Sequence, residues 1–181
     1  MTIILKKGQA LEEIFPAAKW AQLFPASRSA PAGKRLNAGK FVGIIQQNCD
    51  PLATQKQCNM SGTKMLLDTD IVLRLFEGDA DLGTAIQGIE PYLSFITELE
   101  LLGNKYISRE YQEHAEMFVT ECYVIDLNES IKEIARYVQW EYSLKLPDAL
   151  VASTAMCLGI PLLSAERDFE KVKELIFVLY Q

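Results

Sequence analysis

The sequence contains few of the sulfur and imidazole groups that hold zinc or build disulfide frameworks. Its 181 residues include one histidine, His114, and four cysteines, none of them in a Cys-x-x-Cys pair. This composition argues against a zinc site of the usual Cys/His kind and against a small fold held together by disulfides. A reducing cytoplasm is therefore the expected compartment.

Long apolar runs are also absent. No stretch reaches the roughly 20 apolar residues that a membrane helix requires, so we expect no membrane partner. Lys6 and Lys7 follow the first apolar residues, whereas a secretory signal has its charges before them. The remaining composition, 49% hydrophobic and 23% charged, is that of a globular domain with a sizeable core.

Charge is divided unevenly along the chain. Residues 1–64 carry nine basic and three acidic residues, a net charge of +6, whereas residues 65–181 carry nine basic and 21 acidic residues, a net charge of −12. Such a division favours either a basic arm that binds nucleic acid or an arm that neutralises the body to which it is attached. The acidic body argues against broad, nonspecific binding to nucleic acid.

Residues 1–64 are expected to form a mostly irregular N-terminal arm outside the main domain. Helix-like spacing over residues 9–24 is interrupted by Pro16, and residues 25–39 have the composition of a linker. The apolar run over residues 40–46 is compatible with one short strand.

From Met65 onward, short apolar runs alternate with amphipathic segments. The runs predict strands at residues 65–67, 92–96, 122–125, 161–163 and 176–179. The intervening segments predict helices over residues 71–76, 97–103, 108–118, 128–144, 147–159 and 169–175. Strands separated by helices indicate a parallel sheet covered on both faces. We therefore expect residues 65–181 to form one three-layer α/β/α sandwich with about five strands.

Acidic residues follow several of these predicted strands or begin a helix, namely Asp68, Asp70, Glu98, Asp148, Glu166 and Asp168. Because functional sites in open parallel sheets form beyond the carboxyl ends of the strands, we expect these carboxylates to share one edge. Each also has a simpler role when taken alone. Asp68 suits a helix N-cap, and Glu98 and Asp148 suit the first turn of a helix.

Clustered carboxylates repel one another, and a divalent cation removes that penalty. Mg²⁺ and Mn²⁺ prefer oxygen ligands and bridge to phosphate oxygens. The pattern therefore indicates metal-assisted hydrolysis of a nucleic-acid backbone.

Four motifs carry a family resemblance. They are Met-Leu-Leu-Asp68-Thr-Asp-Ile-Val, Phe-Ile-Thr97-Glu98-Leu-Glu-Leu-Leu, Leu-Pro147-Asp148-Ala-Leu-Val and Leu-Leu-Ser164-Ala-Glu166-Arg-Asp168-Phe. In this order they resemble the PIN domain, and more closely the ribonuclease toxins of VapBC toxin–antitoxin pairs. The resemblance spans residues 65–181. It implies a PIN-like fold and a Mg²⁺- or Mn²⁺-dependent endoribonuclease that acts on RNA such as tRNA or rRNA, usually as a homodimer.

The resemblance also implies roles for individual residues. Asp68, Glu98 and Asp148 match the first three acidic positions of the family, as catalytic and metal-binding groups. At the fourth position the family usually has Asp or Asn, where this chain has Glu166, and Asp168 two residues later is the alternative.

Supporting roles fall to four neighbouring residues. Asp70 stands where the family more often has Asn. Thr69 and Ser164 are expected to orient carboxylates or a metal-bound water by hydrogen bonds. Thr97 is also expected to be a supporting residue.

The basic arm has a partial likeness of its own. Residues 39–52 weakly resemble the C-terminal tail of an antitoxin of this family. A basic arm beside an acidic body can lay a Lys or Arg across the acidic edge, either in cis or on a second protomer. The candidate inhibitory residues are Arg28, Lys34, Arg35 and Lys40. The alternative is a basic extension with no partner in the domain.

Two other functions compete with the ribonuclease. The first is a catalytically weak PIN-fold module that binds RNA or a protein, which Glu166 and the attached arm favour. The second is a flap-type nuclease acting on DNA, for which the helical arch and basic clamp are missing from the sequence.

Overall fold

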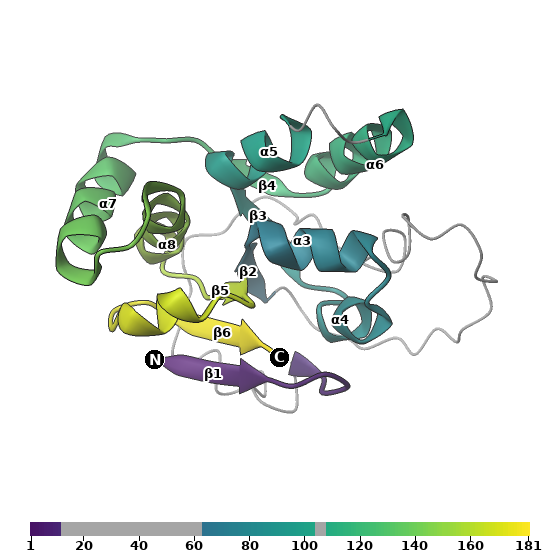
Figure 1. Cartoon of the computed structure of the whole chain (residues 1–181), viewed down its shortest axis with the longest axis horizontal. Coiled ribbons are helices and arrows are strands. Elements are labelled where there is room, and N and C mark those ends of the chain that lie inside the picture. Colours follow the sequence, from purple (N-terminus) through teal and green to yellow (C-terminus); the bar gives the residue numbers. More distant parts are fainter. Residues whose placement is uncertain (12–62, 104–107) are drawn as a thin grey trace.

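The computed structural model describes residues 1–11, 63–103 and 108–181. Its centre is one sheet of six strands in the order β1-β6-β5-β2-β3-β4, with every neighbouring pair parallel. The strands are β1 (Thr2–Leu5), β2 (Lys64–Leu67), β3 (Glu90–Ser94), β4 (Tyr123–Ile125), β5 (Leu162–Ser164) and β6 (Phe177–Tyr180). The twist of this sheet is visible in Figure 1.

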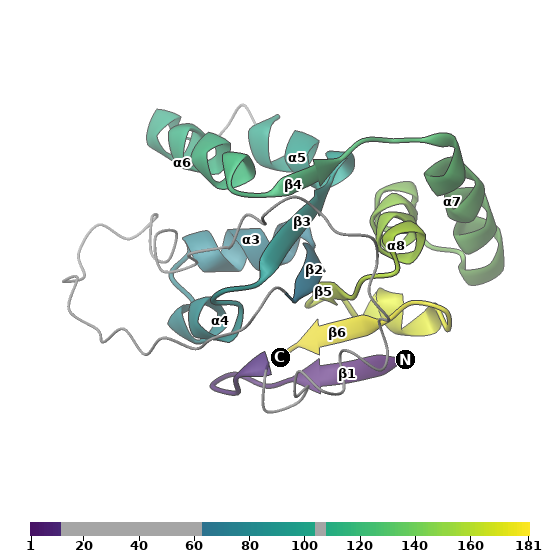
Figure 2. The ribbon, with the colours of Figure 1, turned by 180° about the vertical axis from the view of Figure 1, so that it is seen from behind.

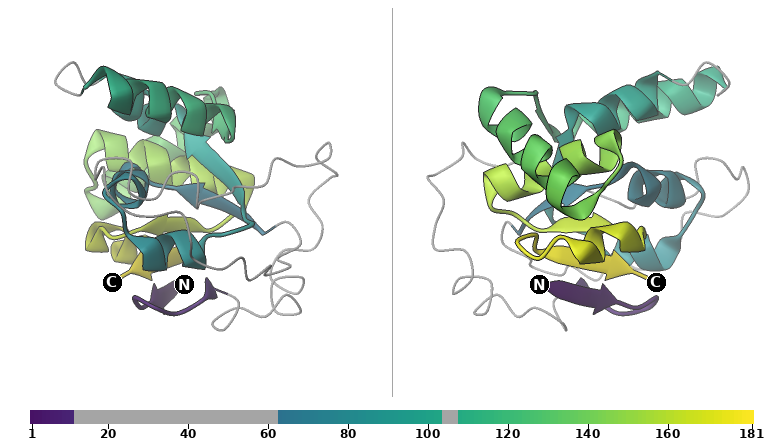
Figure 3. Two further views of the ribbon diagram at one scale, coloured as in Figure 1. Left: turned by 90° about the vertical axis from the view of Figure 1, so that its right-hand side faces the viewer. Right: turned by 60° about the vertical axis from the view of Figure 1, so that its left-hand side comes forward.

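Helices connect the strands. They are α3 (Thr69–Phe76), α4 (Ala80–Ala85), α5 (Phe95–Leu102), α6 (Arg109–Thr120), α7 (Glu129–Tyr142) and α8 (Leu146–Leu158), followed by the 3₁₀ turn η2 (Arg167–Lys171). Helices α7 and α8 pack side by side, joined by three residues (Figure 3). In the described parts of the chain, no helix has the length and apolarity needed to cross a membrane.

The sheet separates two apolar cores. Because successive strand residues point to opposite faces, Met65 and Leu67 of β2 pack with residues of α3, α4 and α6, whereas Leu66 packs with α7, α8 and η2. Figures 1 and 2 show these helices from opposite sides of the molecule. The predicted parallel α/β/α sandwich is therefore confirmed, with six strands rather than about five.

Two local elements differ from the prediction. The segment at 169–175, expected to be a helix, is a 3₁₀ turn at Arg167–Lys171 followed by an irregular connection. Its buried residues, Phe169, Val172 and Leu175, recur every three positions, a spacing that suits 3₁₀ geometry better than an α-helix. The six-residue helix α4 was not expected, because its segment is short and contains Gly83.

The largest difference lies at the start of the chain. Residues 2–5, expected to belong to an irregular arm, form β1 along the outer edge of β6 (Figure 1). Ile3 and Leu5 are buried and join the core that contains Val178 and Tyr180. The expected boundary between arm and domain at residue 64 thus separates residues 2–5 from the sheet to which they belong. Most of the predicted 9–24 helix and the whole predicted 40–46 strand lie outside the described residues.

Hydrogen bonds fix both ends of β1. The N–H of Phe177 donates to the carbonyl of Met1 (2.9 Å), and the N–H of Gln181 donates to the carbonyl of Leu5 (3.0 Å). Beyond the strand, the N–H of Lys7 donates to the carbonyl of Gln181 (2.8 Å). These bonds continue the ladder along the full length of β6.

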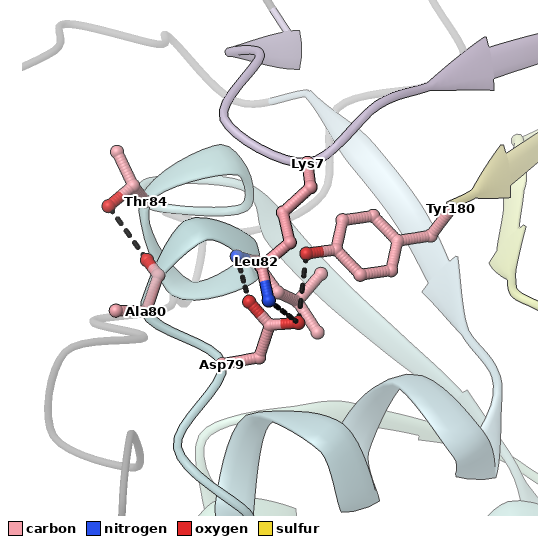
Figure 4. Close-up of polar contacts among 6 residues, drawn as sticks. All are labelled: Lys7, Asp79, Ala80, Leu82, Thr84 and Tyr180. Atoms are coloured by element: carbon pink, nitrogen blue, oxygen red, sulfur yellow. Dashed lines mark hydrogen bonds and ion pairs between the residues drawn. The ribbon is translucent and has the colours of Figure 1, made fainter.

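Asp79 joins the N-terminal and C-terminal segments to α4 (Figure 4). Its Oδ1 caps α4 by accepting from the N–H of Leu82 (3.1 Å), while its Oδ2 accepts from the Tyr180 hydroxyl (3.0 Å) and lies 3.7 Å from Lys7 Nζ. Burial, followed by the hydrogen bond to Asp79, raises the pKa of Tyr180 above its ordinary value of 10.0. A single half-buried carboxylate therefore links three segments.

Substitutions in β1 test its place in the core. We expect Leu5→Ala to lower the free energy of unfolding by about 2–5 kcal/mol, because Leu5 is completely buried. Ile4→Ala is the matched control, since Ile4 points outward and is 49% exposed, and it should change stability by less than about 0.5 kcal/mol. Urea denaturation of the full chain measures both, and equal effects of the two substitutions would contradict the register of β1.

Candidate active site

Asp68 lies where β2 ends and α3 begins. Its backbone N–H donates to the carbonyl of Leu163 in the neighbouring strand β5 (3.1 Å), and its Oδ1 accepts from the N–H of Thr69 (2.8 Å) as the N-cap of α3. The N-cap role suggested by the sequence is therefore real. It also fixes the Asp68 carboxylate at the carboxyl edge of the sheet, between its two central strands.

Asp70, in the first turn of α3, ties this helix to the segment after β5. Its Oδ2 accepts from the N–H of Ala165 (2.8 Å). Its Oδ1 is buried and has no hydrogen-bond partner among the residues that the structure describes. A buried carboxylate oxygen without a donor is costly, and a cation is one means of relieving that cost.

Ser164 connects the two neighbouring strand ends. Its hydroxyl accepts from the N–H of Glu166 (2.9 Å) and lowers the pKa of both Asp68 and Asp70. Ser164 is therefore placed between the Asp68 carboxyl group and the backbone that carries Glu166, and its supporting role stays a prediction.

Burial of these acids makes their ionisation unfavourable. Burial, followed by the charge of Asp70, raises the pKa of Asp68 to about 7. Burial also raises the pKa of Asp70, although the Ala165 N–H and the charge of Arg74 oppose the shift. The pair is therefore poised to bind a cation that would favour its ionised form.

Asp148 enters the same electrostatic cluster from the first turn of α8. Burial raises its pKa, the charges of Asp168 and Glu100 raise it further, and Lys145 lowers it. At the end of β3, the Ser94 hydroxyl lies 3.3 Å from the Thr154 hydroxyl of α8, which holds this helix against the same edge. Asp68 and Asp148 thus reach one edge of the sheet, as the sequence predicted, although they are 80 positions apart in the chain.

The structure distinguishes the two candidates for the fourth acid. Burial raises the pKa of Glu166, followed by the charges of Asp148 and Asp70, and Glu166 also acts on Asp68. Asp168 is exposed, and Lys171 Nζ lies 2.6 Å from its Oδ1 and lowers its pKa. Glu166 is also exposed, and the charge of Asp168 also acts on Asp148 and Glu166. Glu166 differs in acting on Asp68 and in forming no ion pair among the described residues, whereas Asp168 already has a cationic partner.

Helix α5 contributes a carboxylate that the sequence analysis did not select. The hydroxyl of Thr69 donates to Oε2 of Glu100, and the charge of Glu100 raises the pKa of Asp148. Within the described residues, Glu98 forms no ion pair and is not among the main charges that shift the pKa of Asp68, Asp148 or Glu166. Side chains two residues apart on an α-helix are separated by a rotation of roughly 200° about its axis, so Glu98 and Glu100 face different directions.

The sequence offered Glu100 as a second candidate, because Glu98-Leu-Glu100 places two acids two positions apart. The helix was expected to begin at Thr97 but begins at Phe95, and this start sets which acid faces the edge. Thr97 is completely buried, and its Oγ1 has no partner in the described parts of the chain. Thr69 supports Glu100, which was not its expected partner.

A hydrated divalent cation fits this donor set. All the clustered side chains offer carboxylate oxygens, which Mg²⁺ and Mn²⁺ prefer, and Asp70 Oδ1 is buried without a donor among the described residues. No three His, Cys, Asp or Glu side chains in those residues converge closely enough to enclose an ion by themselves. The geometry therefore suits an ion that retains several waters rather than a closed cage of protein ligands. The arm candidates Arg28, Lys34, Arg35 and Lys40 lie outside the described residues.

Comparison with known proteins agrees with this geometry. The sequence model of the PIN domain family matches residues 65–175. A toxin–antitoxin complex from Klebsiella pneumoniae contains a chain 27% identical to this one, with a TM-score of 0.55, over 62% of this chain and 95% of that one. Among curated proteins, none matches the chain.

Two other solved structures share the fold at lower identity. VapBC2 from Rickettsia felis, bound to a DNA fragment from its promoter, is 17% identical with a TM-score of 0.56, over 66% of this chain and 99% of that one. VapBC-1 from nontypeable Haemophilus influenzae is 20% identical with a TM-score of 0.51, over 66% and 97%.

Without a divalent ion, stability should fall as pH rises from about 4 to 7. In the folded chain the pKa of Asp68 is about 7, above its ordinary value of 3.8. The contribution of protonated Asp68 to the free energy of unfolding is therefore complete below pH 4 and is lost as the pH rises through 7. The loss between pH 5 and 8 should be about 2–3 kcal/mol, at roughly 1.36 kcal/mol per pKa unit. Asp68→Asn should remove most of it. Urea denaturation in EDTA tests this, and an unchanged pH dependence in the variant would contradict the buried, protonated state of Asp68.

The two glutamates of α5 form a matched pair for a metal-binding experiment. Glu100→Gln should weaken Mn²⁺ affinity at least about tenfold, because it removes a carboxylate from the edge. Glu98→Gln makes the same chemical change on another side of the helix and should leave the affinity within about twofold. Titration calorimetry with Mn²⁺ measures both, and the reverse ranking would show that Glu98 faces the ion.

Proposed function

Because the chain belongs to the PIN domain family, we propose that it is a Mg²⁺- or Mn²⁺-dependent endoribonuclease and the toxin of a toxin–antitoxin pair. The observation that carries this proposal is that three acids share the carboxyl edge of the sheet: the half-buried Asp68 and Asp148 and the exposed Glu166, each with a raised pKa. Such a cluster disfavours its own ionisation and gains most from a bound divalent cation. Structural similarity to toxin–antitoxin complexes supports the assignment.

The residues that would hold the ion, directly or through its bound waters, are Asp68, Glu100, Asp148 and Glu166. When bound, the ion would supply the positive charge that neutralises a phosphodiester and activates water. The protein orients these ligands through fixed donors. The Thr69 hydroxyl donates to Glu100, the Ala165 N–H donates to Asp70, and the Ser164 hydroxyl lowers the pKa of Asp68.

The basic arm supports the toxin assignment through its charge. The solved relatives are covered over 95–99% of their length by 62–66% of this chain, so the arm is additional sequence relative to them. We propose that Arg28, Lys34, Arg35 or Lys40 occupies the acidic edge in cis or on a second protomer, as a substitute for an antitoxin. The expected homodimer, the expected cytoplasmic location and RNA substrates such as tRNA or rRNA belong to the same proposal.

One observation favours a second function, a PIN-fold module that binds RNA or a protein with little catalysis. In the described segments, no three carboxylates converge tightly, and Asp168 is already paired with Lys171. A module of this kind would bind RNA at the same edge without cutting it.

Cleavage of total tRNA and rRNA by the full chain, with Mg²⁺ or Mn²⁺, separates these functions. The full chain is required because residues 1–11 complete the sheet. We expect cleavage that Asp68→Asn reduces at least about 100-fold, since this substitution removes the central ligand. The combined variant Arg28→Gln, Lys34→Gln, Arg35→Gln and Lys40→Gln should cleave faster than the parent chain.

The possible results of this assay have distinct meanings. Metal-dependent cleavage that Asp68→Asn leaves unchanged would place the catalytic centre elsewhere. Absence of cleavage in both the parent chain and the arm variant, with RNA still bound, would favour the binding module. An arm variant that cuts no faster than the parent would contradict inhibition by these four residues.

A further inference from the structure

Lys145 lies at the start of α8, beside the acidic edge. It is the N-cap residue of α8, and its carbonyl accepts from the N–H of Ala149 (2.9 Å). The preceding residue, Leu144, is buried in the core, and Ser143 ends α7 in the left-handed conformation with φ of 53°. The backbone of Lys145 is thus fixed on both sides, while its side chain is exposed.

The position of Lys145 brings its charge close to acids from two elements. Asp148 follows one turn later on α8, and Glu166 and Asp168 lie on the segment after β5. The positive charge of Lys145 acts on all three of these carboxyl groups. Across the described residues, however, Lys145 enters no ion pair. Its ammonium group therefore lies near the acids without being bound to one of them.

The other basic residues near this edge are placed differently. Lys171 is paired with Asp168 at 2.6 Å, and Arg74 acts on Asp70 from its own helix. Arg167 adjoins Glu166 in the sequence but is not among the main charges that shift the pKa of Asp148 or Glu166. Lys145 is the described basic residue that acts on acids of both α8 and the segment after β5.

An RNA phosphate approaching this edge meets residues 65–181, which carry a net charge of −12 and include several clustered carboxylates. A bound divalent ion offsets only part of that charge, so a cation beside it would aid phosphate binding. We propose that Lys145 contacts a backbone phosphate of the RNA substrate and positions it beside the carboxylate cluster. This inference rests on the proposed ribonuclease function and names a substrate-positioning residue for it.

The test combines steady-state cleavage with RNA binding in the full chain. Lys145→Gln should raise KM for tRNA cleavage about tenfold with kcat within about twofold, because a phosphate contact made in both ground and transition states affects binding. The slope of log affinity against log salt should decrease by about one. Lys145→Arg should restore both quantities. Lys132→Gln removes a charge already paired with Glu129 on α7 and serves as the matched control.

Binding of labelled tRNA to Asp68→Asn, with and without Lys145→Gln, separates this inference from the function on which it rests. If the parent chain cuts no RNA but Lys145→Gln weakens binding and lowers the salt dependence, the phosphate contact stands and the nuclease assignment fails. If the parent chain cuts RNA but Lys145→Gln leaves KM, affinity and salt dependence unchanged, the inference is overturned. Equal losses in Lys145→Gln and Lys132→Gln would also overturn it, as would failure of Lys145→Arg to restore binding. Urea denaturation of each variant verifies that it is folded.

Discussion

Repulsion among carboxylates that are held partly out of water is the constraint on which the acidic edge depends. Asp68 and Asp70 lie within one turn of each other at the end of the central strand β2, and burial disfavours the ionised form of both. Nothing about an apolar core requires such a pair, and replacing it with neutral groups should stabilise the metal-free chain. The rest of the fold must therefore hold the two carboxylates in place despite the free-energy cost of burying them in ionised form. A bound divalent cation would offset that cost.

The topology shows how this is achieved. Strand β2 lies between β5 and β3, so the ends of three neighbouring strands open onto one edge. Each strand end has its own anchor: Asp68 caps α3, Ser164 links Asp68 to the Glu166 backbone, and Ser94 contacts α8 through Thr154. These anchors use short polar side chains buried under the helices. The apolar cores on both faces supply the stability that keeps the anchors in register.

Sequence reasoning succeeded where the signal was local and periodic. Apolar runs followed by acids located the strand ends and brought Asp68 and Asp148 to one edge, because parallel strands share the direction of their carboxyl ends. It was less successful where the outcome depended on long-range contact or helical phase. The four residues of β1 pair with a strand more than 170 positions away, and nothing in Thr-Ile-Ile-Leu specifies that partner. The choice between Glu98 and Glu100 depended on the residue at which α5 begins, because a shift of two positions rotates a side chain by roughly 200°.

The central claim is that the edge formed by Asp68, Glu100, Asp148 and Glu166 binds a divalent ion. Anomalous diffraction from a crystal of the full chain grown with Mn²⁺ tests it most directly, because it locates the ion without reference to activity. The account predicts an anomalous peak about 2.2 Å from carboxylate oxygens of this cluster, including Asp68, with waters completing the octahedron. A peak coordinated only by Asp168 or by acids other than Asp68, Glu100, Asp148 and Glu166, or an empty edge at millimolar Mn²⁺, would contradict this claim.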